Sequence, residues 1–85
     1  MSTNEQATRG SLVCRKVPPD TLLPLFETPE RRLTKDMKFM RHHDIAFVIT
    51  STYTPQDRNY NSYRILYVIT PNGIGWIKSE YLKSL

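Results

Sequence analysis

The stretch from Gly73 to Leu85, GIGWIKSEYLKSL, carries most of the information about the fold of this 85-residue chain. It follows Asn72, and an Asn-Gly pair tolerates the positive φ of a tight turn. Residues 74–78 combine β-branched and aromatic side chains, which favour a short strand. The next three residues, SEY, allow one helical turn before the terminal LKSL. The stretch therefore predicts a turn, a strand, one helical turn and a short last segment.

Three earlier segments predict further strands. Residues 10–17, GSLVCRKV, form a β-branched and apolar run that ends at two prolines, and residues 44–54 and 62–70 alternate with dense β-branched content. The polar segment 55–61, PQDRNYN, has the length of a hairpin connection. Residues 18–36 hold four prolines, so we expect a long excursion there with at most one short edge strand. The order predicts about five short antiparallel strands.

Length and composition limit the chain to one small domain. Eighty-five residues fall below the usual allotment of about 100–200 residues per domain. The polar, aperiodic residues 1–9 predict a mobile N-terminal tail, so the folded domain is expected to span residues 10–85. The apolar positions predict a core made of Leu12, Val13, Leu25, Ile45, Phe47, Val48, Ile65, Val68, Ile77 and Leu82.

The C-terminal stretch resembles the end of an SH3 domain, where a Gly-aromatic-aliphatic strand leads into one helical turn and a last strand. The residues at matching places are Gly75, Trp76, Ile77, Ser79, Tyr81 and Leu82. The resemblance implies a mainly β fold, a small five-stranded SH3-like barrel with a long RT-type loop over residues 18–43 and one short 3-10 turn near the C-terminus. It also implies that Ile77 and Leu82 face the interior, that Trp76 is half exposed, and that Gly75 lets a neighbouring strand approach closely.

The opening RGSLVCRKV and the closing GWIKSEYLKSL are also similar to those of short SH3-like proteins of tailed bacteriophages, including cyanophages. In those proteins a Gly-x-Leu-Val strand and a Gly-Trp-Ile plus Tyr-Leu segment bracket a variable middle. The resemblance concerns the fold rather than recognition of proline-rich peptides, because Lys78 and Glu80 stand where the SH3 peptide groove has proline and asparagine.

Composition and cysteine usage bear on the compartment. The chain is 39% hydrophobic and 24% charged, and no apolar run approaches the roughly 18–20 residues that span a bilayer. The N-terminus lacks the apolar region of a secretory signal, and Cys14 has no partner for an internal disulfide. We therefore expect a cytoplasmic protein, located in the host cytoplasm if a phage encodes it, that does not associate with a membrane. We expect Cys14 to be a small buried hydrophobe.

No pattern indicates catalysis. The chain has no nucleophile elbow and no Gly-rich phosphate loop, and its carboxylates are dispersed. The only histidine cluster is RHHD, residues 41–44. Adjacent histidines on extended backbone point to opposite faces, so we expect a solvated turn there rather than a metal site. From the sequence we therefore expect a protein that is not an enzyme and that holds no cofactor.

Two binding hypotheses remain open. Large, stiff tyrosines near loops and the terminal turn favour a protein partner, and the predicted contact residues are Tyr60, Tyr63, Trp76 and Tyr81. The alternative is a nucleic-acid-binding barrel, for which the predicted contacts are Arg31, Arg32, Lys35, Lys38 and Arg41. A basic stripe beside Phe39 suits a phosphate backbone, and the net charge of +4 favours anionic partners, yet a solvated loop explains the same charges.

Overall fold

A computed structural model describes residues 9–30, 36–54 and 62–85 of the chain. Seven strands and one 3-10 helix follow in the order β1 (Leu12–Arg15), β2 (Pro24–Leu25), β3 (Lys38–Phe39), β4 (Ile45–Tyr53), β5 (Arg64–Thr70), β6 (Gly73–Lys78), η1 (Ser79–Tyr81) and β7 (Leu82–Ser84). The mainly β class, the short edge strand in the excursion and the helical turn at SEY are confirmed. The predicted tail, apart from Arg9, and the predicted connection 55–61 lie outside the described residues.

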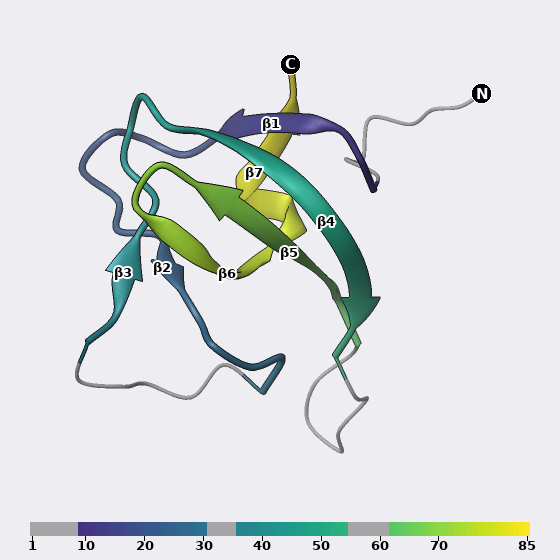
Figure 1. Ribbon diagram of the computed structural model, residues 1–85. Coiled ribbons are helices and arrows are strands. Elements are labelled where there is room, and N and C mark those ends of the chain that lie inside the picture. The colour runs from purple at the N-terminus through teal and green to yellow at the C-terminus, as the bar shows by residue number, and fades with distance from the viewer. Residues whose placement is uncertain (1–8, 31–35, 55–61) are drawn as a thin grey trace.

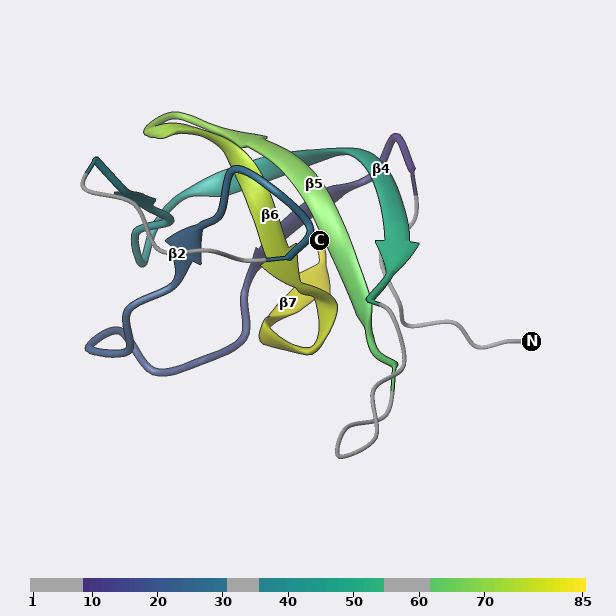
Figure 2. The same ribbon diagram turned by 90° about the horizontal axis from the view of Figure 1, so that it is seen from below.

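Five strands form one antiparallel sheet in the order β6-β5-β4-β1-β7. β4 is the longest strand and curves strongly across the sheet, as Figure 1 shows. β2 and β3 make a separate two-stranded hairpin, which lies beside β6 (Figure 2). Within the described residues the large sheet is not closed into a barrel, since its edge strands β6 and β7 are not hydrogen-bonded neighbours.

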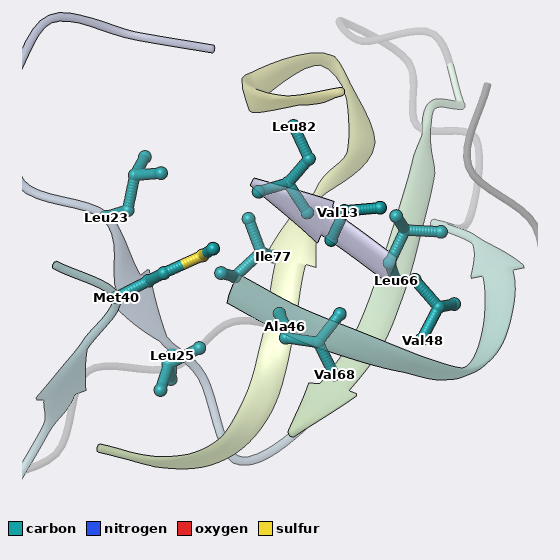
Figure 3. Packing of buried hydrophobic residues seen from close by; sticks show 10 residues of the cluster. All are labelled: Val13, Leu23, Leu25, Met40, Ala46, Val48, Leu66, Val68, Ile77 and Leu82. Atoms are coloured by element: carbon teal, nitrogen blue, oxygen red, sulfur yellow. The ribbon is translucent and has the colours of Figure 1, made fainter. Parts of the chain in front are cut away.

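The core lies between the inner face of the large sheet and the long connection from β1 to β4. Figure 3 shows Leu23, Leu25 and Met40 of the connection on one side of the cluster and the side chains of the sheet on the other. Ile77 and Leu82 are 2% and 5% exposed, which confirms their predicted inward position. The prediction missed four core residues, namely Leu23, Met40, Ala46 and Leu66.

Three residues predicted for the core lie on the outer face instead. Leu12, Ile45 and Phe47 are exposed. Their neighbours Val13, Ala46 and Val48 are fully buried. Both faces of these strands are apolar, so alternation defines two faces without deciding which one is buried. Cys14 shares the outer face and is partly buried, where we expected a small buried hydrophobe.

Two glycines of the C-terminal stretch have the predicted roles. Gly73 has a φ of 147°, and it closes the turn between β5 and β6. A Cβ added at Gly75 would lie 2.7 Å from the Cβ of Leu25 and 3.0 Å from the carbonyl oxygen of Phe26. Gly75 therefore lets β2 cross directly over β6, and the backbones of Phe26 and Trp76 exchange two hydrogen bonds of 2.8 and 3.1 Å there.

A buried arginine ties the long connection to the sheet. Arg15 lies on the inner side of β1 and is 8% exposed. Its guanidinium donates to the carbonyl oxygens of Met40 and Pro18, both at 2.8 Å, and to that of Thr21. The amide of Met40 in turn donates to the carbonyl of Leu23 at 2.9 Å. These bonds hold both ends of the connection over the core.

Candidate functional site

An aromatic and cationic cluster lies where β6 runs into η1. The amino group of Lys78 is 4.5 Å from the ring centre of Tyr63 and 5.7 Å from that of Tyr81. Both distances fall within the roughly 6 Å over which a cation is attracted to an aromatic face. Glu80 is mostly exposed and holds the same amino group at 3.4 Å. Lys78 thus joins two tyrosines that are 18 residues apart in the sequence.

Trp76 extends this cluster along the outer face of the sheet. It is two residues from Lys78 on β6, so both side chains project to the same side. Its cross-strand partner is Tyr67, and the two ring centres are 4.8 Å apart at an interplanar angle of 33°. Both rings are partly buried, leaving a tilted aromatic pair next to the lysine.

The backbone around the cluster is fixed on several sides. The backbone of Trp76 is hydrogen-bonded to the backbone of Phe26 in the connection. The amide of Tyr63 donates to the hydroxyl of Thr54 at 3.1 Å, and the amide of Thr54 donates to the carbonyl of Tyr63 at 2.9 Å. Tyr81 packs against the core. A rigid aromatic surface loses little side-chain entropy when a partner docks on it, which favours recognition.

A pocket of about 540 Å³ lies on the long connection. Lys38, Arg41 and His42 line it, together with the half-exposed ring of Phe39. One wall is formed by Asn72, whose side-chain amide donates to the carboxylate of Asp44 at 2.6 Å. The same carboxylate accepts the backbone N–H of Arg41 at 2.8 Å. The pocket therefore offers positive charge and an aromatic ring on an ordered turn.

The RHHD segment forms the predicted turn, with the amide of Asp44 donating to the carbonyl of Arg41 at 3.0 Å. The backbone is not extended there, and the rings of His42 and His43 lie side by side with centres 4.4 Å apart. Our expectation that the two imidazoles point to opposite faces is therefore wrong. Among the described residues, no group of three or more His, Cys, Asp or Glu side chains could hold a metal ion.

The structure brings together three of the four residues predicted to contact a protein. Tyr63 and Tyr81 flank Lys78, and Trp76 stands beside them, whereas Tyr60 lies outside the described residues. The sequence reasoning missed Lys78 and Tyr67. Period-2 alternation along β5 and β6 could have found both, because it puts them on the face of Tyr63 and Trp76.

Only two of the five cations predicted to contact nucleic acid can be placed. Lys38 and Arg41 line the pocket described above. Arg31, Arg32 and Lys35 lie outside the described residues.

Comparisons of the chain with protein-family models, with curated proteins and with solved structures found no match. In the part of the chain that the structure describes, no helix has the length and apolar character needed to cross a membrane. The case for function therefore comes from the surface itself.

Proposed function

We propose that this protein is a small non-catalytic binding module that holds a protein partner through Tyr63, Trp76 and Tyr81. The observation that carries the proposal is the position of Lys78 between two tyrosine rings, 4.5 and 5.7 Å from their centres, next to the Tyr67–Trp76 pair. Aromatic anchors of this kind commonly dominate the binding free energy of protein interfaces.

The chemistry of the cluster favours a partner segment with an acidic side chain next to an apolar one. The rings offer flat apolar surface, and Lys78 offers an ammonium group whose side chain is 24% exposed. Glu80 is 61% exposed and its carboxylate lies 3.4 Å from this ammonium group, so a partner carboxylate can displace it. Exchange of one exposed ion pair for another costs little free energy.

The same proposal includes an SH3-like fold and a relationship to the short SH3-like proteins of tailed phages. Supporting features are the strand order β6-β5-β4-β1-β7, the long β1–β4 connection and the 3-10 turn between β6 and β7. The motifs at the two ends of the chain support the phage relationship. On such a fold, loops and strand ends carry recognition.

The experiment is a pull-down from the native host followed by calorimetric titration of the captured partner. Trp76→Ala and Tyr81→Ala should each weaken binding by at least about 30-fold, which corresponds to a loss of about 2 kcal/mol at an anchor residue. Tyr53→Ala is the matched control, because Tyr53 is 64% exposed and lies outside the cluster. Circular dichroism confirms that each variant is folded. Unchanged affinity in a folded Trp76→Ala, Tyr81→Ala double variant refutes the site.

The second candidate function is nucleic-acid binding at the pocket lined by Lys38 and Arg41. It is favoured by the convergence of these two cations with His42 and the half-exposed ring of Phe39 around one pocket. Cations that neutralise phosphates make binding fall steeply with salt, and an aromatic ring can stack on a base.

Fluorescence anisotropy with duplex and single-stranded oligonucleotides at about 50 mM salt tests this candidate. Three to four phosphate contacts predict a slope of about −3 for log affinity against log salt on duplex DNA. Replacing Lys38 and Arg41 by glutamine should flatten the slope by about two units, whereas Lys83→Gln on β7 should leave it nearly unchanged. No binding at low salt eliminates this candidate and leaves the protein partner.

A further inference from the structure

The outer face of the large sheet carries a continuous row of exposed apolar side chains. Of the nine exposed large hydrophobic residues among those described, six belong to this row. They are Leu12, Ile45, Phe47, Ile69, Ile74 and Leu85, with exposed fractions between 45% and 66%. We call these six residues the apolar row.

The strand register aligns five of the six residues across the sheet, and Ile45 lies beside them on β4, opposite Cys14. Leu12 of β1 pairs with Phe47 of β4, which pairs with Ile69 of β5, which pairs with Ile74 of β6. The amide of Leu85 donates to the carbonyl of Leu12 at 3.1 Å, which adds Leu85 at the β7 end. Neighbouring strands are about 4.8 Å apart, so the row is roughly 19 Å long.

The opposite end of the same face is already covered. Ile65 alternates with Tyr67 and Ile69 on β5, but it is wholly buried, and η1 lies against β5. Ile69, four residues further along the strand, is 47% exposed. The outer face is therefore closed by this chain's own residues at one end and open at the apolar row.

The segments outside the described residues contain few apolar side chains. Residues 1–8 read MSTNEQAT, residues 31–35 read RRLTK and residues 55–61 read PQDRNYN. These sequences are mostly polar or charged. Their larger apolar side chains are one methionine, one leucine and one tyrosine. Within the described part of the chain the row stays exposed, so a second molecule can cover it.

The size of the row fits a dimer interface. Six side chains that each expose about half of a surface of roughly 150 Å², the lower bound for an aromatic side chain, present about 450 Å² of apolar surface. That lies within the range of the largest patches on monomers, about 300–600 Å², which are often functional. A standard interface buries about 800 Å² on each partner. The apolar row supplies more than half of that area, and the flanking Cys14 and Thr50 extend it on the same face.

We propose that the apolar row is the contact surface between two copies of this chain, which pack the outer faces of their sheets together about a two-fold axis. A row that crosses the strands is self-complementary, because a two-fold axis through its middle, parallel to β4, places Phe47 of one copy on Phe47 of the other and Leu12 on Ile69. None of its side chains can form a hydrogen bond that would select a different partner. Interfaces between identical subunits are the more apolar class.

The charge of the chain gives this dimer a distinctive salt dependence. Each copy has a net charge of +4, so two copies repel each other at low ionic strength. The apolar row itself holds no charged side chain, and the nearest placed cation on this face is Lys83, opposite Cys14 at the β7 edge. Added salt screens the repulsion and strengthens apolar contacts. The dimer should therefore tighten as salt rises, whereas nucleic-acid binding would weaken.

The test is sedimentation equilibrium of the full chain from about 1 to about 200 μM, since interfaces near the standard size have dissociation constants that are micromolar or tighter. We expect a reversible monomer–dimer equilibrium. The double variant Phe47→Thr, Ile69→Thr should raise the dissociation constant by at least about 30-fold, because each copy loses two central anchors. Threonine suits a strand, and both positions face outward, so the fold should persist.

The matched control is the double variant Leu22→Thr, Tyr53→Thr. These side chains are 72% and 64% exposed and lie outside the apolar row, so the control should dimerise like the wild type. If the Phe47→Thr, Ile69→Thr chain fails to fold, dilution of the wild type followed by amide NMR shifts takes its place. The shifts should then change at Leu12, Phe47, Ile69 and Ile74.

A monomer across the whole concentration range overturns the proposal, as does a dimer that the Phe47→Thr, Ile69→Thr variant leaves intact. Assembly beyond a dimer also overturns it, because a two-fold contact closes on itself. A dimer that weakens between about 50 and about 500 mM salt would be held by charge and not by the apolar row. NMR shifts that change on dilution at residues outside the apolar row also overturn the proposal.

Discussion

Replacing Gly75 by alanine tests the central packing argument, because its sign depends on one close contact. At a position without steric conflict, a glycine-to-alanine change stabilises a protein by about 0.4–1 kcal/mol, since it restricts the unfolded chain. At Gly75 the new Cβ would lie 2.7 Å from the Cβ of Leu25, 2.9 Å from its carbonyl carbon and 3.0 Å from the carbonyl oxygen of Phe26. Two of these three atoms belong to the backbone, so β2 must move away from β6.

The expected loss combines two effects. Overpacking of a well-filled site costs about 1–3 kcal/mol. Displacement of β2 also weakens the two hydrogen bonds between Phe26 and Trp76, each of which contributes about 0.5–1.5 kcal/mol. We expect the free energy of unfolding to fall by about 3 kcal/mol. With a urea dependence near 1.5 kcal/mol per molar for a small domain, the midpoint of unfolding should fall by about 2 M.

Urea unfolding followed by the fluorescence of Trp76, the single tryptophan, and by circular dichroism measures this change. In a Leu25→Ala background the cost of Gly75→Ala should persist, because alanine keeps the Cβ that makes the 2.7 Å contact. Gly10→Ala is the control, since no atom lies within 4 Å of its added Cβ and its φ of 83° predicts a loss of only about 1–2 kcal/mol. A Gly75→Ala chain as stable as the wild type, or more stable, would refute the close approach of β2.

Three further changes test other parts of the fold, each by urea unfolding. Arg15→Met should lower the free energy of unfolding by about 3 kcal/mol, because three carbonyl oxygens lose a charged donor; Arg15→Lys should recover part of this, and a loss below about 1 kcal/mol would contradict the role of the guanidinium. Thr70→Val should cost about 1–2 kcal/mol, because the hydroxyl donates to the carbonyl of Gly73 and accepts the amide of Asn72, both at 3.0 Å; an unchanged midpoint would contradict it. Gly73→Ala should cost about 1–2 kcal/mol through its φ of 147°, and little more, since the nearest atom to its added Cβ belongs to the flexible side chain of Lys38.

The strands could be predicted from the sequence, but their buried faces could not. In residues 45–49, Ile-Ala-Phe-Val-Ile, both alternating sets are apolar, and the larger set would be the natural choice for a core. The structure buries Ala46 and Val48. The reason is that the long connection contributes Leu23, Leu25 and Met40, and these fill the volume above the sheet. The sequence predicted Leu25 for the core but not Leu23 or Met40, because the four prolines of residues 18–36 indicate only a long irregular excursion.

The candidate site could be predicted in part, for a similar reason. Tyr63 and Trp76 follow from the strand pattern, and Tyr81 follows from the turn at its expected place. Lys78 stood out only as a departure from the SH3 pattern, although alternation along β6 places it on the face of Trp76. One feature of the sequence predicts that Arg15 is buried. It stands two residues after the inward-facing Val13 on the same strand.

The packing of the connection links the core to the aromatic cluster and leaves the apolar row independent of it. The hydrogen bonds between Phe26 and Trp76 attach the connection to β6 at the residue whose ring lies on Tyr67. Any change that lifts β2 from Gly75 therefore disturbs Trp76, and with it the proposed partner site. The pairings of the apolar row from Leu12 to Ile74 run through β1, β4, β5 and β6 without involving β2 or β3. The two proposed surfaces can thus be weakened separately, one through the connection and the other through the outer face of the sheet.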